Sequence, residues 1–150
     1  SLPSAVLTTL CIPKVVVIPN NCFEGNASLI SVDASSATTL GEECFKDCYS
    51  LTSVDTRMVV TLGDSCFKNC HSLKKADFPL MGDTNIGEST FKNCWGLLNI
   101  NFPEFEGDIG DEAFRNCILL KKAEFPSRAD SSTTGTDAFT GCYSLETIVA

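Results

Sequence analysis

The side chains that could do chemistry in this chain are nine cysteines, one histidine and a series of carboxylates. Structural zinc sites need closely paired Cys or Cys/His ligands. The only close cysteine pairs, Cys44/Cys48 and Cys66/Cys70, are separated by three residues, and His71 is the only histidine. An odd number of cysteines also cannot close into a complete set of disulfides within one chain. We therefore expect no metal site and interpret most cysteines as small buried apolar residues. Disulfides between coils, in an oxidising compartment, are the alternative.

No catalytic set stands out either. The sequence contains no nucleophile elbow, phosphate-binding loop or metalloprotease helix motif. General acid–base catalysis needs carboxylates whose environments push their pKa values apart, whereas the carboxylates here recur in similar surroundings. We predict that the protein is not an enzyme and has no cofactor.

An internal repeat indicates the elements that position these residues. The stretch "LGDSCFKNCHSLKKADFP" at 62–79 returns as "IGDEAFRNCILLKKAEFP" at 109–126. A leucine column runs through Leu7, Leu29, Leu51, Leu73, Leu97, Leu120 and Leu145. Six residues before it stand Phe23, Phe45, Phe67, Phe91, Phe114 and Phe139, and three before it stand Cys48, Cys70, Cys94, Cys117 and Cys142. Such regular columns indicate a repeat architecture.

Each unit reads as a short strand and a short helix. After the leucine, apolar and polar residues alternate, as they do in a strand. In several units Pro then ends the strand, because Pro has no backbone N–H to donate to a neighbouring strand. The half around Asp111, Phe114 and Arg115 suits one or two helical turns that begin with an acidic residue. A unit of about 22 residues cannot bury its Leu and Phe alone, so successive units must stack to share one core.

The motif "IGDEAFRNCILLKKAEFP" resembles the BspA-type leucine-rich repeat, also called the Treponema pallidum type. The resemblance covers residues 1–150 as a single solenoid of about seven repeats, the first and last partial. It implies an α/β solenoid, a right-handed superhelix with a concave parallel β-sheet and short convex helices. It also implies a location at a cell surface or outside the cell, and an adhesion role toward host or microbial proteins. Pro19, Asn26 and Thr134 depart from the motif in individual units.

The outward strand positions are the first candidate binding surface. Four residues after the leucine column, Asp33, Asp55, Asp77, Asn101 and Glu124 should stack at a spacing of about 4.8 Å. Lysines on adjacent columns, Lys74, Lys75, Lys121 and Lys122, could offset this charge. The row is either a solvated face with weak local ion pairs or a groove for a basic partner or Ca²⁺, although no defined calcium loop is present.

A second column follows the cysteines at the corner between the two halves of each unit. It contains Tyr49, His71, Trp95, Ile118 and Tyr143. Half-exposed aromatic residues in a row can anchor a partner, as hot-spot residues do, or they can lie flat on the next coil. Trp95 is the best single candidate.

The charge limits the range of partners. With 11 basic and 19 acidic residues the net charge is −8, which argues against nucleic acid and anionic membranes, and no apolar run is long enough to span a bilayer. The leading hypothesis is a secreted or surface protein that binds a protein or glycan through its concave face or rim. The alternative is a structural block whose ends, near Ser1 and Ala150, stack head to tail into a filament.

Overall fold

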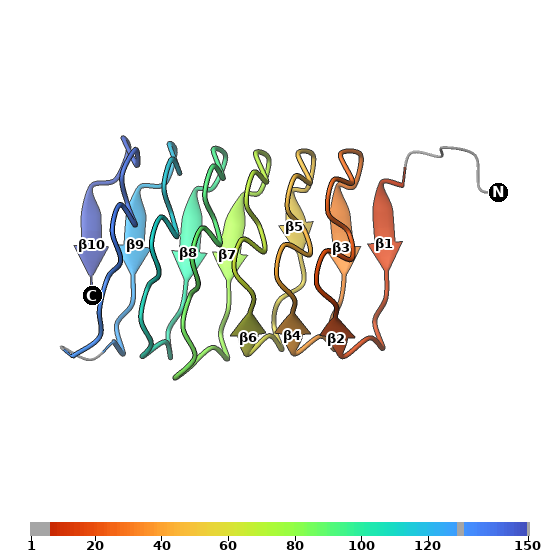
Figure 1. The fold of residues 1–150 in the computed structure, drawn as a ribbon, viewed down its shortest axis with the longest axis horizontal. Helices are drawn as coiled ribbons and strands as arrows, with labels where there is room; N and C mark the ends of the chain where they lie inside the picture. Colours follow the sequence, from red (N-terminus) through yellow and green to blue (C-terminus); the bar gives the residue numbers. More distant parts are fainter. Residues whose placement is uncertain (1–6, 129–130, 150) are drawn as a thin grey trace.

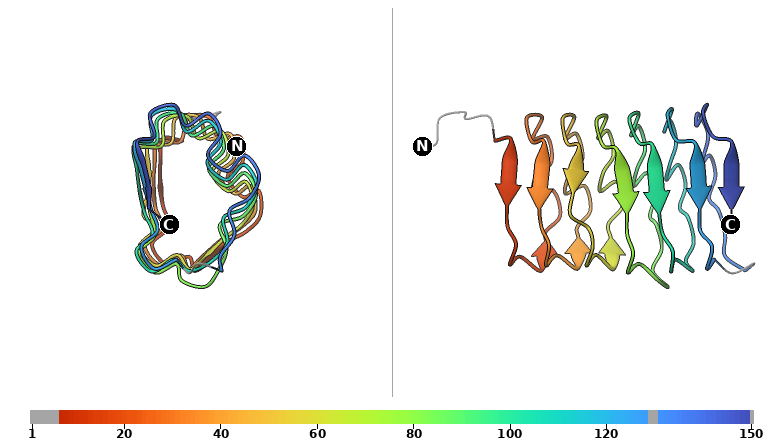
Figure 2. Two further views of the ribbon diagram at one scale, coloured as in Figure 1. Left: turned by 90° about the vertical axis from the view of Figure 1, so that its left-hand side faces the viewer. Right: turned by 180° about the vertical axis from the view of Figure 1, so that it is seen from behind.

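The protein is a stack of parallel β coils. The computed structural model describes residues 7–128 and 131–149, so Ser1 and Ala150 lie outside the described residues. The coils follow one another along a single axis, with the two ends of the described chain at opposite ends of the stack (Figure 1). Viewed along that axis, the coils nearly superpose (Figure 2). The strand face, which we define as the surface formed by the longer strands, is therefore close to flat.

Each coil contributes one strand to this face. The first sheet has the order β1 (Thr9–Cys11), β3 (Ser31–Asp33), β5 (Ser53–Val54). The second has the order β7 (Lys75–Asp77), β8 (Asn99–Asn101), β9 (Lys122–Glu124), β10 (Thr147–Val149). All pairs are parallel, as stacked coils of one repeat require. The middle residue of each three-residue strand lies in the column that points inward, for example Val32, Ala76 and Ala123.

A further, shorter sheet lies on another side of the first coils. It consists of β2 (Val17–Ile18), β4 (Thr39–Leu40) and β6 (Thr61–Leu62). In the later coils, single parallel bridges replace it, from Ile86 to Ile109 and from Ile109 to Thr134. The connectors of the later coils are longer in sequence, and three of them begin with Pro79, Pro103 and Pro126.

The repeat columns meet in one core. Phe45, Phe67, Phe91 and Phe114 are buried, as are Leu51, Leu73, Leu97 and Leu120, whereas Phe139 and Leu145 are partly buried at the end of the stack. Neighbouring phenylalanine rings lie parallel, with centroids 5.5 Å apart from Phe67 to Phe91 and 5.2 Å from Phe91 to Phe114. Offset parallel rings are a favourable aromatic geometry. In the leucine column, Leu73, Leu97 and Leu120 stand two residues before strands β7, β8 and β9, respectively.

The short helices expected on the other side are absent: the described residues contain none, and turns take their place. In the coil of Phe45, the backbone N–H groups of Glu43, Phe45 and Asp47 donate to the next coil, to the carbonyls of Asp64, Cys66 and Lys68. The intervening N–H groups of Cys44, Lys46 and Cys48 close turns within the coil, at 3.2–3.3 Å. A helix would use all these donors internally, so the stacking of coils displaces it.

The turns require left-handed backbone at two positions per coil. Asp47, Asn69, Asn93 and Asn116 have φ of 61°, 64°, 60° and 62°, and Glu43, Ser65, Ser89 and Glu112 have φ of 55°. Asn and Asp tolerate this region better than other residues with a side chain. The asparagine side chains also form a ladder, since Asn69 donates to Asp47 at 2.7 Å, Asn93 to Asn69 at 2.8 Å and Asn116 to Asn93 at 2.9 Å.

The cysteine column has a specific role in the core. The thiols of Cys48, Cys70, Cys94, Cys117 and Cys142 donate to the carbonyl oxygens of Phe23, Phe45, Phe67, Phe91 and Phe114, at 3.1–3.2 Å. Each acceptor belongs to the preceding coil, so the column links consecutive coils. The thiols in this column and in the second column of Cys22, Cys44 and Cys66 are free.

The strand face is interrupted between β5 and β7. The hydroxyl of Thr56 donates to the carbonyl of Asp77 there, beside the end of the ladder. The inward column changes at the same place, from Ala34 and Thr56 to Phe78 and then Phe102. The later coils therefore have larger inward side chains, and the change occurs where the two sheets separate. We call this place, between β5 and β7, the seam.

Candidate functional site: the strand face and its rim

The predicted carboxylate row forms one line of side chains across the strand face. The strand register pairs Cys11 with Asp33, Asp77 with Asn101, and Glu124 with Val149. Two residues earlier on each strand, and therefore on the same face, lies a second line, Thr9, Ser31, Ser53, Lys75, Asn99 and Lys122. Hydroxyl groups in the early coils give way to lysine and asparagine in the later ones.

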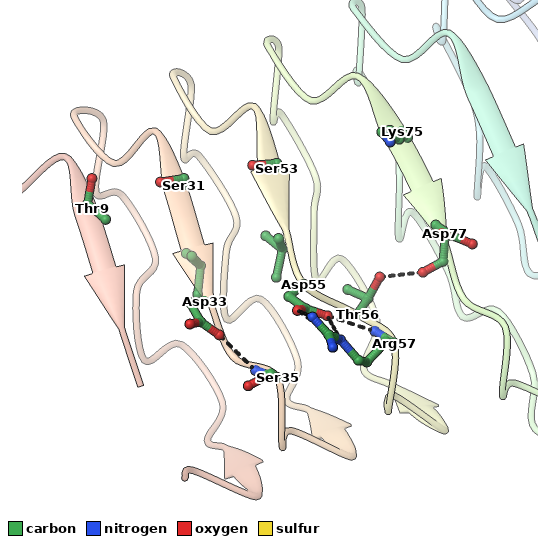
Figure 3. A pocket seen from close by; sticks show the side chains of 12 residues that line it. Thr9, Ser31, Asp33, Ser35, Ser53, Asp55, Thr56, Arg57, Lys75 and Asp77 are labelled. Carbon is green, nitrogen blue, oxygen red and sulfur yellow. Dashed lines mark hydrogen bonds and ion pairs between the residues drawn. The ribbon is translucent and has the colours of Figure 1, made fainter. Parts of the chain in front are cut away.

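A groove of about 620 Å³ lies over the early coils of this face, from β1 to β7. Figure 3 shows Thr9, Ser31 and Ser53 in one row, with Asp33, Asp55 and Asp77 in the next. Arg57 and Ser35 lie beyond the carboxylates (Figure 3). The groove follows from residue size, because short serine and threonine side chains stand where the later coils carry Lys75 and Lys122.

The carboxylates in the groove are not equivalent. Arg57 donates to both oxygens of Asp55, at 2.5–3.0 Å, and this guanidinium lowers the pKa of the Asp55 carboxyl below its usual value. Asp77 accepts from the Asn101 amide at 2.8 Å, and Asp33 accepts from the backbone N–H of Ser35 at 3.3 Å. Among the described residues, Asp33 and Asp77 have no basic side chain within ion-pair distance.

Only one of the lysines beside the carboxylate row forms an ion pair among the described residues. Lys122 lies 2.8 Å from Glu124 on β9. In the early coils Arg57 forms the ion pair with Asp55. Arg57 was not among the residues predicted from the sequence. Arg57 and the hydroxyl row could have been found from the strand period, since they stand two residues after and two before the carboxylates.

The predicted aromatic column forms a continuous stack in part. The ring centroids of His71 and Trp95 are 3.6 Å apart with an angle of 2° between the rings, and those of Tyr49 and His71 are 5.0 Å apart at 29°. The rings therefore lie on one another and still present exposed surface, 45% of Trp95 and 43% of Tyr49. Ile118, which has no ring, and Tyr143 continue the column, and Tyr143 is 84% exposed.

His71 lies at this rim and does not line the groove. Burial lowers the pKa of its imidazole, while Asp47 acts in the opposite direction. Among the described residues no group of three His, Cys, Asp or Glu side chains is placed to hold a metal ion. The arrangement offers hydrogen-bond donors, acceptors and charge to a ligand, with stacked aromatic rings alongside.

These features define a class of protein, the parallel β solenoids built from leucine-rich repeats. Six copies of the BspA-type leucine-rich repeat region match residues 4–120 and 61–150. The chain belongs to this family.

Two solved structures are similar to the chain. A leucine-rich cell surface protein from Faecalibacterium prausnitzii has a TM-score of 0.85 at 25% identity, over 95% of this chain and 38% of that chain. The leucine-rich repeat protein of T. pallidum has a TM-score of 0.53 at 16% identity, over 95% of this chain and 79% of that chain. The chain thus spans well under half of the F. prausnitzii protein. No curated protein matches it.

The described residues include no helix long and apolar enough to cross a membrane.

Proposed function

We propose that this chain is a recognition module displayed at a cell surface or secreted, which binds a protein partner through its strand face without chemical turnover. Family membership and the similarity to a protein named as a cell surface protein support the location. The observation that carries the binding role is the groove, where Asp33 and Asp77 offer charge beside a row of hydroxyl groups. This pattern favours a partner with basic side chains.

Binding arrays test the proposal. The chain would be screened against surface proteins and glycans, and each hit measured with the double variant Asp33→Asn/Asp77→Asn. Asn has nearly the same shape and can still accept the bond from Asn101, so the fold should be kept. We expect the affinity to fall at least tenfold.

Asp83→Asn is the matched control, because Asp83 is exposed and does not line the groove. It removes one negative charge at a distance from the groove and should leave the affinity unchanged. Equal affinity for the double variant and the wild type would show that the groove is not the site.

The location can be tested separately. We expect an antibody or an amine-reactive label that cannot enter cells to reach the protein on intact cells of its source, or to find it in the medium. A label that reaches it only after lysis would contradict the surface assignment.

Self-stacking is the second candidate, favoured by the end strand. Ile148 is 50% exposed on β10 although it stands in the inward column, and a following coil would cover it. That coil could come from a longer chain or from another copy of this one. Sedimentation velocity at rising concentration distinguishes the two: filament growth would support stacking between copies, and a constant monomer mass would eliminate it.

A further inference from the structure

A second surface, apart from the groove, crosses the rim of the later coils. It consists of exposed apolar side chains, which we call the apolar ridge: Trp95, Leu98, Ile118, Leu119 and Tyr143. The register that pairs Asn99 with Lys122 and Lys122 with Thr147 aligns Trp95 with Ile118 and Tyr143 on successive coils. These three residues therefore form one column along the stack, and Leu98 and Leu119 stand in the columns beside it.

Trp95, on the first coil of the ridge, is held in place before any partner arrives. The Trp95 ring lies on His71 at 3.6 Å, and His71 in turn contacts Tyr49. An aromatic ring that is already ordered loses little conformational entropy on binding. Contiguous apolar patches on a soluble protein often mark interaction sites, so this ridge has the properties of an anchor.

Lysines border the ridge on its strand side. Lys74 and Lys121 share a row with Leu98, since the N–H of Leu98 donates to the carbonyl of Lys74 and the N–H of Glu146 to that of Lys121. Lys75 stands next to Lys74 on β7. Among the described residues these three exposed lysines form no ion pair. Glu146, on the coil after Lys121, is the one acidic residue in this row, so the border is net positive on a chain of net charge −8.

We propose that the apolar ridge docks an acidic protein segment whose leucine or aromatic side chains cover Trp95 and whose carboxylates meet Lys74 and Lys121. This inference rests on the proposed recognition function and adds a second contact of opposite charge preference. Anionic lipid would also meet the lysines. However, a flat anionic bilayer would lie over the carboxylate row of the strand face as well as over the lysines, whereas a short acidic segment can contact the ridge and Lys74 without covering that row.

Trp95 is the only tryptophan, so its fluorescence reports on the ridge directly. The probe is a 12-residue peptide of Glu, Leu and Phe, compared with a peptide that has Lys in place of Glu. We expect only the acidic peptide to shift the Trp95 emission to shorter wavelength, with an affinity that falls as salt screens the charges. The double variant Lys74→Gln/Lys121→Gln and the single variant Leu119→Glu should each weaken binding at least tenfold.

Two controls separate this site from the groove. Lys14→Gln removes an exposed lysine from the first coil and should bind the acidic peptide as the wild type does. Asp33→Asn/Asp77→Asn should bind it at least as tightly as the wild type does, so this test succeeds or fails independently of the groove. Circular dichroism checks that each variant is folded.

Equal binding of both peptides, no emission shift with either, or full binding by the folded ridge variants would overturn the proposal. Phosphatidylserine vesicles that shift the emission while the acidic peptide does not would assign the ridge to a membrane surface and overturn it as well.

Discussion

At the scale of single residues, the left-handed turn positions explain why asparagine recurs. Asn93 has φ of 60° and joins the amide ladder on both sides, donating to Asn69 at 2.8 Å and accepting from Asn116 at 2.9 Å. The sequence shows the column as a polar position. Only the backbone angle shows that the residue is chosen for its conformation as well as for its hydrogen bonds.

We predict that Asn93→Ala lowers the free energy of unfolding by about 2–3 kcal/mol, because it adds the cost of left-handed backbone to the loss of two amide bonds. Asn93→Gly, which tolerates positive φ, should cost about 1 kcal/mol less. Urea unfolding measures both. Equal losses would mean that the backbone angle contributes nothing to the choice of residue.

His71 provides a prediction for pH. Burial in the stack lowers its pKa from the usual value of 6.5, so the folded state favours the neutral imidazole. The stability that this contributes is present above the unfolded pKa and is lost as pH falls through the folded pKa. Between pH 7 and pH 5, the wild type should therefore lose stability relative to His71→Phe, which keeps a stacked ring without a titrating group.

Unfolding of both proteins at several pH values measures this difference and cancels the titration of carboxylates common to both. A gain for the wild type at low pH would mean that attraction of the imidazolium to the rings of Tyr49 and Trp95, or to Asp47, exceeds the cost of burying its charge.

At the scale of elements, the phenylalanine stack couples the coils. Phe91 contacts the rings of Phe67 and Phe114 face to face and those of Phe78 and Phe102 edge to face. Two aromatic columns meet around this residue, because the inward strand position becomes phenylalanine after the seam. The middle of the stack is thus packed on more sides than its ends.

We predict that Phe91→Ala lowers the free energy of unfolding by about 3–5 kcal/mol, as truncation of a buried phenylalanine does. Phe139→Ala is the matched comparison. It stacks on one side only, on Phe114, and is partly buried, so its loss should be clearly smaller. Similar losses at the two positions would show that stacking from both sides adds nothing.

At the scale of the whole molecule, the cysteines report on how the stack opens. Cys11 and Cys22 are exposed, while Cys44, Cys48, Cys66, Cys70, Cys94 and Cys117 are buried. Burial raises the pKa of the Cys48 thiol to about 12 and raises the pKa of the Cys94 thiol still further. The thiolate is the reactive form, so folding should protect these groups.

We predict that Ellman's reagent modifies two thiols rapidly in the native protein and the six buried thiols only as the coils unfold. Half-buried Cys142 should react at an intermediate rate. Cys11→Ser/Cys22→Ser should abolish the rapid phase. Rapid reaction of more than three thiols would mean that the coils separate readily under native conditions.

Much of this architecture could be read from the sequence, because the repeat places the same side chains at the same interval. The inward columns of Phe, Leu and Cys, the outward carboxylate row and the rim of Tyr49, His71 and Trp95 all follow from that period. The period states which side chains point inward, and stacking is the only way for such short units to bury them.

The tertiary structure decided the rest, because it depends on what each group meets in the neighbouring coil. The prediction of short convex helices was wrong. In the segment around each column phenylalanine, every second backbone N–H donates to a carbonyl of the next coil and not to one within its own coil. The groove exists because short side chains stand beside one another across coils before the seam. The 3.6 Å contact of His71 with Trp95 likewise needs two coils in contact, and no single repeat contains it.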